Sequence, residues 1–283
     1  MARAVDVGYA GIRLKRRSGE AGPEEETTDD LFAWAAAQAS PAKLVVIIDE
    51  ITVLASAIDK EHPGGALEFL RSFRRPRQEL GNVAVILAGS VGIHHAVRKP
   101  EPVNDLRRVR VGPLADDDAL LLAQCLILGA DVHVEDPGKV AAAMVDASDG
   151  IPYFLHHLAA AAQRQGGTLA AEDVWRFRDI ALTDPDDPWN FRHYRDRIPD
   201  YYDDDRDVVT AVLDAHAVVD RPLRLEELSN VLAGIEPKFR PSRDDLLRVL
   251  EDIEADHYLV RTGDETVFAS RILRDAWRAM RRL

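Results

Sequence analysis

Two adjacent carboxylates, Asp49 and Glu50, directly follow the apolar run from Leu44 to Ile48. A short run rich in β-branched residues predicts a strand buried on both faces, as in a parallel sheet covered by helices. The acids then lie at the carboxyl end of the strand, where open α/β sheets bind ligands. Carboxylates at this place can hold Mg²⁺ and orient a water molecule that attacks a triphosphate. A buried strand that ends in solvated acids is the alternative interpretation.

A second apolar run, Val83 to Ala88, ends in Gly89-Ser90, and a helix is predicted between the two runs from about residue 66 to residue 74. Two strands joined by a helix form a right-handed crossover unit. Ser90 is then a small polar residue at the tip of the second strand. The alternative is a plain Gly-Ser turn after a strand.

Composition limits the classes of protein that the chain can represent. Its 283 residues suffice for two or three small domains. The single cysteine, Cys125, excludes a disulfide framework, fits a reducing cytoplasm, and is expected in the core of an apolar helix. No apolar stretch is long enough to span a bilayer, and no signal peptide is evident. The formal net charge of −13 argues against non-specific nucleic-acid binding by the whole chain, although a local basic face stays possible.

Four regions are expected along the chain: a nucleotide-binding core over 1–114, a helical region over 115–180, a linker rich in Asp and Pro over 181–200, and a C-terminal domain over 201–283. A third short strand is expected from Asn104 to Val111. Within the helical region, Gly150 can end one helix and Pro152 can begin the next.

The C-terminal region predicts a winged helix-turn-helix. Three helices, the third capped by Ser242 with Asp245 in the capping-box position, precede a hairpin whose strands are 258–261 and 266–269. A last helix, 271–283, buries one apolar face and carries arginines on the other.

Taken in this order, LVVIIDE, VAVILAGS, DGIPYFL and the winged helix resemble the AAA-like ATPases of the STAND group, in particular bacterial and archaeal members related to Orc/Cdc6-type ATPases. The resemblance covers most of the chain from about Lys43 onward. It implies an α/β fold with a parallel-sheet P-loop NTPase core, a helical lid and a winged helix, and it implies binding of ATP with Mg²⁺.

The resemblance also implies roles for individual residues. Asp49 is the expected metal ligand, Glu50 the residue that polarises water, and Ser90 the polar sensor near the γ-phosphate. Gly150 and Pro152 match the Gly-x-Pro that lies beside the adenine. Arg107 and Arg108 are candidates for an arginine finger by placement, with solvated surface arginines as the alternative.

One element of the family is missing from the sequence. A P-loop reads GxxxxGKS or GxxxxGKT, because backbone N–H groups and a lysine bind the phosphates. The only lysines ahead of Asp49 are Lys15 and Lys43, and neither lies in such a motif. The P-loop is therefore expected upstream of this sequence, lost, or supplied by another chain. ATP hydrolysis by the chain alone is expected to be weak or absent, and part of the sheet is expected to be exposed and prone to association.

Three classes of function stay open. The first is a nucleotide-dependent switch, the second a non-catalytic scaffold, and the third a winged-helix DNA-binding regulator. The predicted recognition helix contains Arg243 and Arg248 but more acids than arginines, which disfavours DNA. A protein partner or self-association is expected, DNA through the winged helix is possible, and a membrane partner is not expected.

Overall fold

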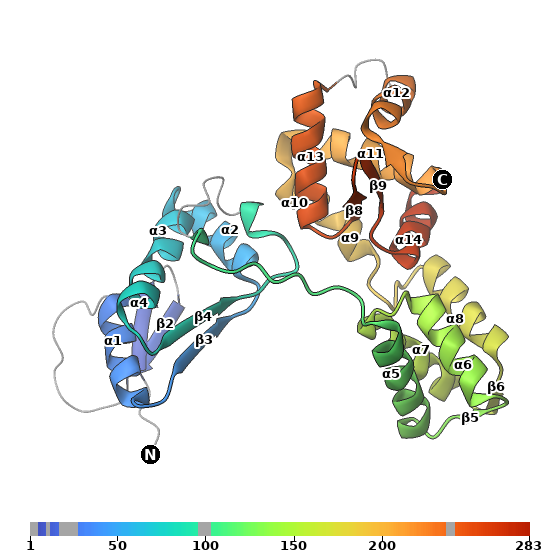
Figure 1. The fold of residues 1–283 in the computed structure, drawn as a ribbon, viewed down its shortest axis with the longest axis horizontal. Helices are drawn as coiled ribbons and strands as arrows, with labels where there is room; N and C mark the ends of the chain where they lie inside the picture. Colours follow the sequence, from blue (N-terminus) through green and yellow to red (C-terminus); the bar gives the residue numbers. More distant parts are fainter. Residues whose placement is uncertain (1–4, 10–11, 17–27, 96–102, 236–240) are drawn as a thin grey trace. The chain divides into compact units, whose positions relative to one another are not determined.

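The structure is a computed structural model that describes residues 5–9, 12–16, 28–95, 103–235 and 241–283. The chain divides into two compact units, Met1–Arg108 and Val109–Leu283, which are described separately (Figure 1). No described helix combines the length and the apolar character that crossing a membrane requires.

The first unit contains a hairpin, a parallel strand pair and helices that follow one another along the chain. Its elements are β1 (Val5–Tyr9), β2 (Ile12–Arg16), α1 (Thr28–Ala39), β3 (Leu44–Ile48), α2 (Ile51–Glu61), α3 (Gly65–Ser72), α4 (Arg74–Glu79), β4 (Val83–Leu87) and the 3₁₀ helix η1 (Ile93–His95). The two strands predicted from their apolar runs are both present. β2 contains three basic residues, Arg13, Lys15 and Arg16.

The strands β3 and β4 run parallel, with Leu44 opposite Val83 and Ile48 opposite Leu87. One face of this pair packs on a small core that includes Ile58, Leu70 and Phe73. Side chains of the other face are exposed, namely Val45 at 50%, Ile47 at 67% and Ile86 at 50%. The expectation that both faces are buried is therefore wrong for the described residues. The predicted exposure of part of the sheet is confirmed.

The third strand expected over residues 104–111 is also absent. After a turn at 104–105 the described chain has no regular structure up to residue 115, and Val109 and Val111 are 74% and 85% exposed. A strand needs a neighbouring strand for its backbone hydrogen bonds. Among the described residues the parallel sheet has only β3 and β4, so the extended sequence around Val109 has no sheet neighbour.

The second unit is helix-rich. Its elements are α5 (Asp116–Gly129), β5 (His133–Val134), α6 (Pro137–Ser148), α7 (Pro152–Gln165), β6 (Thr168–Leu169), α8 (Ala171–Thr183), α9 (Arg192–Asp196), α10 (Ile198–Tyr201), the 3₁₀ helix η3 (Asp203–Asp205), α11 (Arg206–Val218), β7 (Leu223–Arg224), α12 (Leu225–Ile235), α13 (Arg243–Ala255), β8 (Leu259–Thr262), β9 (Glu265–Phe268) and α14 (Arg271–Arg281). The last three strands form an antiparallel sheet in the order β7-β9-β8. One continuous core extends from Ala119 on α5 to Trp277 on α14.

The segment 181–200, predicted as a linker, contributes to this core. Trp189 and Phe191 are each 2% exposed, and the Phe191 ring stacks on Phe154 of α7 at a centroid distance of 5.2 Å. Burying two large aromatic rings removes much apolar surface from water and so favours packing of this segment on the core. Composition alone therefore misjudges this segment, because its two aromatic residues decide its packing.

A buried polar network fixes the end of this segment to the connection between α13 and β8. Arg197, 6% exposed, donates from Nε to the Tyr258 hydroxyl (2.6 Å) and from Nη2 to the backbone oxygen of Asp256 (3.0 Å). The Tyr202 hydroxyl donates to the Asp256 carboxylate (2.6 Å). Burial raises the pKa of Tyr258 to about 12, so its hydroxyl keeps the proton. Such a network is stable because its buried polar groups have partners.

Cys125 lies on the exposed side of α5 and not in the core. Its helical neighbours on that side, Leu121 and Leu128, are 59% and 81% exposed. The run from residue 119 to residue 128 is apolar on all sides, so its periodicity cannot indicate which face is buried. The residues of α5 that face the core include the small residues Ala119 and Ala123, both fully buried.

Candidate nucleotide and metal site

The carboxyl ends of β3 and β4 are joined by backbone hydrogen bonds beyond the strands themselves. The Ala88 N–H donates to Ile48 O (2.9 Å), and the Ile51 N–H donates to Ala88 O (2.9 Å). These bonds hold the chain that leaves β4 against the start of α2. The residues between them, 49–50 and 89–90, therefore lie at the same edge of the sheet.

Glu50 joins the strand to the helix in a left-handed conformation, with φ 50° and ψ 40°. A non-glycine residue rarely adopts this region, and when it does so the surrounding structure holds it there. Part of that support comes from Thr52, which is fully buried and donates its hydroxyl to Val91 O (2.8 Å). The turn thus presents the Glu50 carboxylate toward the end of β4.

Glu50 and Ser90, the two residues predicted to be catalytic, are in direct contact. The Ser90 hydroxyl donates to Glu50 Oε2 at 3.1 Å, and the Ser90 N–H lies 3.5 Å from the same oxygen. Both side chains are exposed. A carboxylate oriented in this way can accept a proton from, or orient, a water molecule at the edge of the sheet.

Asp49, the predicted metal ligand, is exposed beside this pair. Its Oδ1 accepts the Glu50 N–H at 2.9 Å. Among the described residues no lysine or arginine forms an ion pair with either acid. Carboxylate and hydroxyl oxygens are the donors that Mg²⁺ prefers, so the donor set of Asp49, Glu50 and Ser90 fits this ion.

The same edge does not fit the phosphates of a nucleotide. Lys43 precedes β3 and so lies at the opposite end of the strand from Asp49, about 20 Å away at roughly 3.3 Å per residue. Lys60 lies in the last turn of α2, away from the helix start. Neither Lys43 nor Lys60 therefore lies where a P-loop would place its lysine.

Gly150 and Pro152 belong to the second unit and are described there by themselves. Gly150 has a φ of 66°, donates its N–H to Val145 O (3.0 Å) and accepts the Leu114 N–H (3.0 Å). A Cβ at this position would lie 3.2 Å from Leu114 O, so the turn favours glycine on two grounds. The prediction that one helix ends here and Pro152 begins the next is confirmed by α6 and α7.

The residue before this turn, Asp149, has a role that the sequence did not reveal. Its Oδ1 accepts from Arg271 Nε (2.8 Å) and its Oδ2 from the Ile272 N–H (2.8 Å) at the start of α14. The carboxylate raises the pKa of Arg271 and provides a cap at a helix N-terminus. Because more than 120 residues separate the partners, no local pattern could have indicated the contact.

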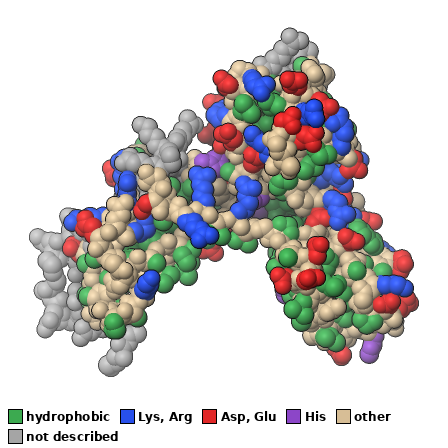
Figure 2. Space-filling model, in the orientation of Figure 1, with side chains coloured by type: hydrophobic (Ala, Val, Ile, Leu, Met, Phe, Trp, Pro, Cys, Tyr) green, Lys and Arg blue, Asp and Glu red, His purple; other side chains and the backbone are tan. Residues whose placement is uncertain are grey.

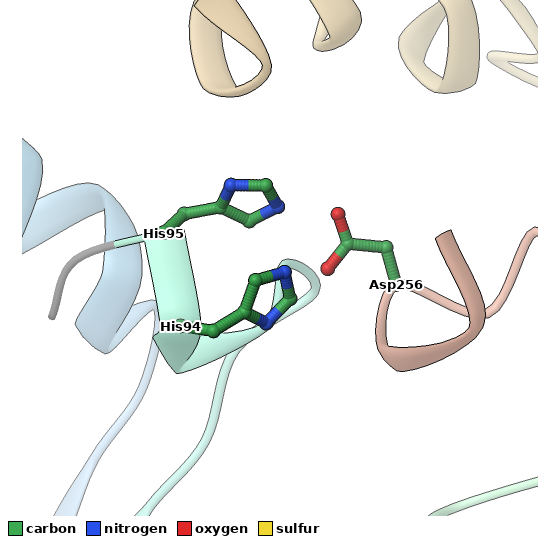
Figure 3. A group of neighbouring side chains, drawn as sticks. All are labelled: His94, His95 and Asp256. Carbon is green, nitrogen blue, oxygen red and sulfur yellow. The ribbon is translucent and has the colours of Figure 1, made fainter. Parts of the chain in front are cut away.

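Two adjacent histidines lie on η1. The rings of His94 and His95 extend from the same side of this turn, with centroids 4.1 Å apart (Figure 3). Asp256, also labelled in Figure 3, belongs to the second unit and to the buried network around Arg197.

The arginines of the second unit are mostly paired within it. Acidic and basic side chains are interleaved over the visible face of this unit (Figure 2). On α14, Arg274 pairs with Asp220 and Asp275, and Arg281 pairs with Asp214 (2.7 Å). Arg107 and Arg108, the candidates for an arginine finger, are exposed in the irregular segment before the second unit.

Comparison with known proteins supports the fold. The sequence matches no family model and no curated protein. Among solved structures, a Walker-type ATPase of Pyrococcus abyssi is similar with a TM-score of 0.60 and 19% identity, over 89% of this chain. The match covers 66% of that protein, so this chain spans just under two thirds of its length. The RuvB Holliday junction branch migration motor of Thermotoga maritima matches over 86% of this chain and 72% of its own, at 15% identity, but its TM-score of 0.37 supports no argument.

This chain therefore has a helix-rich α/β fold with a small parallel sheet, similar to that of a Walker-type ATPase. At the level of fold alone, this similarity agrees with the P-loop ATPase resemblance predicted from the sequence.

Proposed function

We propose that this chain is a nucleotide-dependent switch of the AAA/STAND type that uses Walker B acids with Mg²⁺. In this proposal Asp49 binds the metal, Glu50 orients water and Ser90 reports on the γ-phosphate. The hydrogen bond between Ser90 and Glu50 at the carboxyl edge of two parallel strands is the observation that carries the proposal. Bound Mg²⁺ would supply charge neutralisation at the phosphate oxygens.

The expected affinity for nucleotide is low. Each missing charge-assisted hydrogen bond to phosphate removes about 1.5–3 kcal/mol, which corresponds to roughly tenfold or more in the dissociation constant. The candidate site provides acids for the metal, and neither Lys43 nor Lys60 is placed to bind the phosphates. Binding by the chain alone is therefore expected to depend strongly on Mg²⁺, and hydrolysis is expected to be slow or absent.

The second unit is proposed as a helical lid followed by a winged helix. The succession of α11, β7, α12, α13, β8 and β9, with the sheet order β7-β9-β8, supports the winged helix. The fixed turn at Gly150 and the helix start at Pro152 support a lid in which these residues lie beside the adenine.

Titration with a fluorescent N-methylanthraniloyl-ATP tests the proposal. We expect saturable binding in Mg²⁺ that weakens at least about tenfold in EDTA and in Asp49→Asn. Glu68→Gln is the matched control, because Glu68 is an exposed acid on α3 away from the candidate site. Absence of binding up to millimolar nucleotide, or equal binding by the wild type and Asp49→Asn, would contradict the switch.

A non-catalytic scaffold is the second candidate. The exposed apolar face of β3 and β4, with Ile47 67% exposed, favours it because such a face promotes association with a protein partner or a second copy. DNA binding has less support, since α13 carries Asp244, Asp245 and Glu251 on or near its exposed side. A sedimentation experiment without nucleotide distinguishes the scaffold from the switch, because only the scaffold predicts association that ATP and Mg²⁺ leave unchanged.

A further inference from the structure

The second unit contains a groove of about 210 Å³ between α13, the start of α12 and the hairpin of β8 and β9. Its floor is apolar, formed by Leu225, Leu247 and Leu250. Its polar lining includes Arg243, Arg261 and Asp264. We propose that this groove binds the C-terminal residue of a partner protein, with an aliphatic side chain on the floor and the carboxylate at the arginines.

Charge is the first argument for a carboxylate. Arg243, the first residue of α13, is exposed, and its side chain forms no ion pair or hydrogen bond with the described part of the chain. Arg261 uses Nε to bind Glu254 (2.9 Å), while its Nη2 is buried and has no hydrogen-bond partner among the described residues. A carboxylate that contacts the guanidinium groups lining the groove forms strong, charge-assisted hydrogen bonds.

The acid in the lining fits the same occupant. Asp264 lies in the hairpin turn, and its one ion pair with the described residues is long, 3.8 Å to Arg224. A terminal residue of a peptide has a backbone N–H as well as a carboxylate, and Asp264 can accept that N–H. Thr266 also lines the groove, but its hydroxyl is already bonded to His216 (2.8 Å) and does not contribute.

Size and surrounding charge argue against other ligands. A volume of about 210 Å³ is smaller than the roughly 300–1,000 Å³ of pockets for drug-sized molecules, so it suits a single residue. The acids Asp244 and Asp245 next to Arg243 would repel the phosphates of a nucleic acid. A peptide carboxylate places one negative charge beside the two arginines. A nucleic acid would also place negative phosphates beside Asp244 and Asp245.

Fluorescence anisotropy with the full chain tests the proposal. The probe is a fluorescein-labelled peptide, Ser-Gly-Ser-Gly-Leu, with a free carboxylate, and its matched control is the same peptide with a C-terminal amide. We expect the free carboxylate to bind in the range of 0.1–1 mM, roughly as a small ligand should, and the amide to bind at least about tenfold more weakly. Equal binding of the two peptides would overturn the proposal. So would the absence of binding of either peptide up to about 5 mM.

Substitutions locate the binding. Arg243→Gln should weaken binding of the carboxylate peptide at least about fivefold. The fold should be unaffected, because the Arg243 side chain bonds to no other described residue. Arg278→Gln on α14 is the control, since Arg278 is an equally exposed arginine of the same unit outside the groove. An unchanged affinity in Arg243→Gln would overturn the proposal. So would a short DNA duplex that binds more tightly than the peptide and loses affinity in the same variant. The peptide experiment uses no nucleotide, so its result is independent of the proposed switch.

Discussion

The two units of this chain bury apolar surface in different ways. In the first, β3 and β4 pack on helices through one face, and Ile47 on the other face is 67% exposed. In the second, one core runs from α5 to α14 and includes the segment predicted as a linker. The candidate metal site lies at the end of a sheet with one exposed face, whereas Gly150 is buried in the second unit.

This difference has a consequence for function. Asp49, Glu50 and Ser90 lie where backbone hydrogen bonds join the ends of two strands, and their side chains are exposed. Gly150 is buried, and the Asp149 carboxylate accepts a hydrogen bond from the start of α14. Substitutions should therefore affect stability little in the first site and more in the second.

The largest effect is expected from Trp277→Ala in the continuous core. Trp277 is 1% exposed, and its Nε1 donates to Asp214 (2.8 Å). Removing a buried aromatic ring of this size should lower the free energy of unfolding by about 3–5 kcal/mol. Urea denaturation followed by circular dichroism measures it, with exposed Arg278→Ala as the control on the same helix. A loss below about 1 kcal/mol would show that the core of the second unit is not continuous.

A smaller effect is expected from Asp149→Asn. The substitution removes the charge that binds Arg271 and caps α14, and asparagine tolerates the left-handed φ of 50°. We expect the second unit to lose about 1–2 kcal/mol of unfolding free energy. Asp146→Asn is the matched control, since Asp146 is 67% exposed and its carboxylate lies 3.5 Å from Arg271. Equal losses in the two variants would mean that Asp149 does not hold α14 in place.

The free energy of unfolding of the second unit should also depend on pH. His216 is 2% exposed, and burial lowers its pKa below the ordinary value. Below about pH 6.5, His216 therefore binds a proton more readily in the unfolded chain than in the folded one. As the pH falls, its contribution to the free energy of unfolding decreases by at most about 1.4 kcal/mol per pH unit. His157 and His257 have lowered pKa values for the same reason, so the informative quantity is the difference between the wild type and His216→Gln. Identical slopes of unfolding free energy between pH 5 and 6.5 would contradict this role of His216.

The smallest effect on stability is expected from Ile47→Ser on the exposed sheet face. Because the side chain is 67% exposed, the unfolding free energy should change by less than about 1 kcal/mol. Self-association in sedimentation should decrease, since an exposed apolar side chain is removed. Val46→Ser on the same strand is the control, because Val46 packs on the core and its loss should cost more. If Ile47→Ser destabilised the chain as much as Val46→Ser, another part of the protein would cover this face.

Local patterns predicted the elements well where one short stretch of chain decides the outcome. The runs at 44–48 and 83–88 are strands, and Ser242 caps α13 by accepting the Asp245 N–H (3.1 Å). The hairpin expected at 258–269 is present as β8 and β9. Patterns failed where a long-range neighbour decides, as for the expected strand around Val109 and for the exposed Cys125.

The sequence by itself determined that two apolar strands end in Asp49, Glu50 and Ser90, and that a Gly-x-Pro turn joins two helices. These follow from residue type and spacing, because strand periods, caps and turns are local. Only the tertiary structure decided that Ser90 donates a hydrogen bond to Glu50 and that one face of the sheet is exposed. It also decided that Asp149 accepts a hydrogen bond from the start of α14. Such contacts join residues that are far apart in the chain, so they depend on which surfaces are left to pack against each other once the local elements have formed.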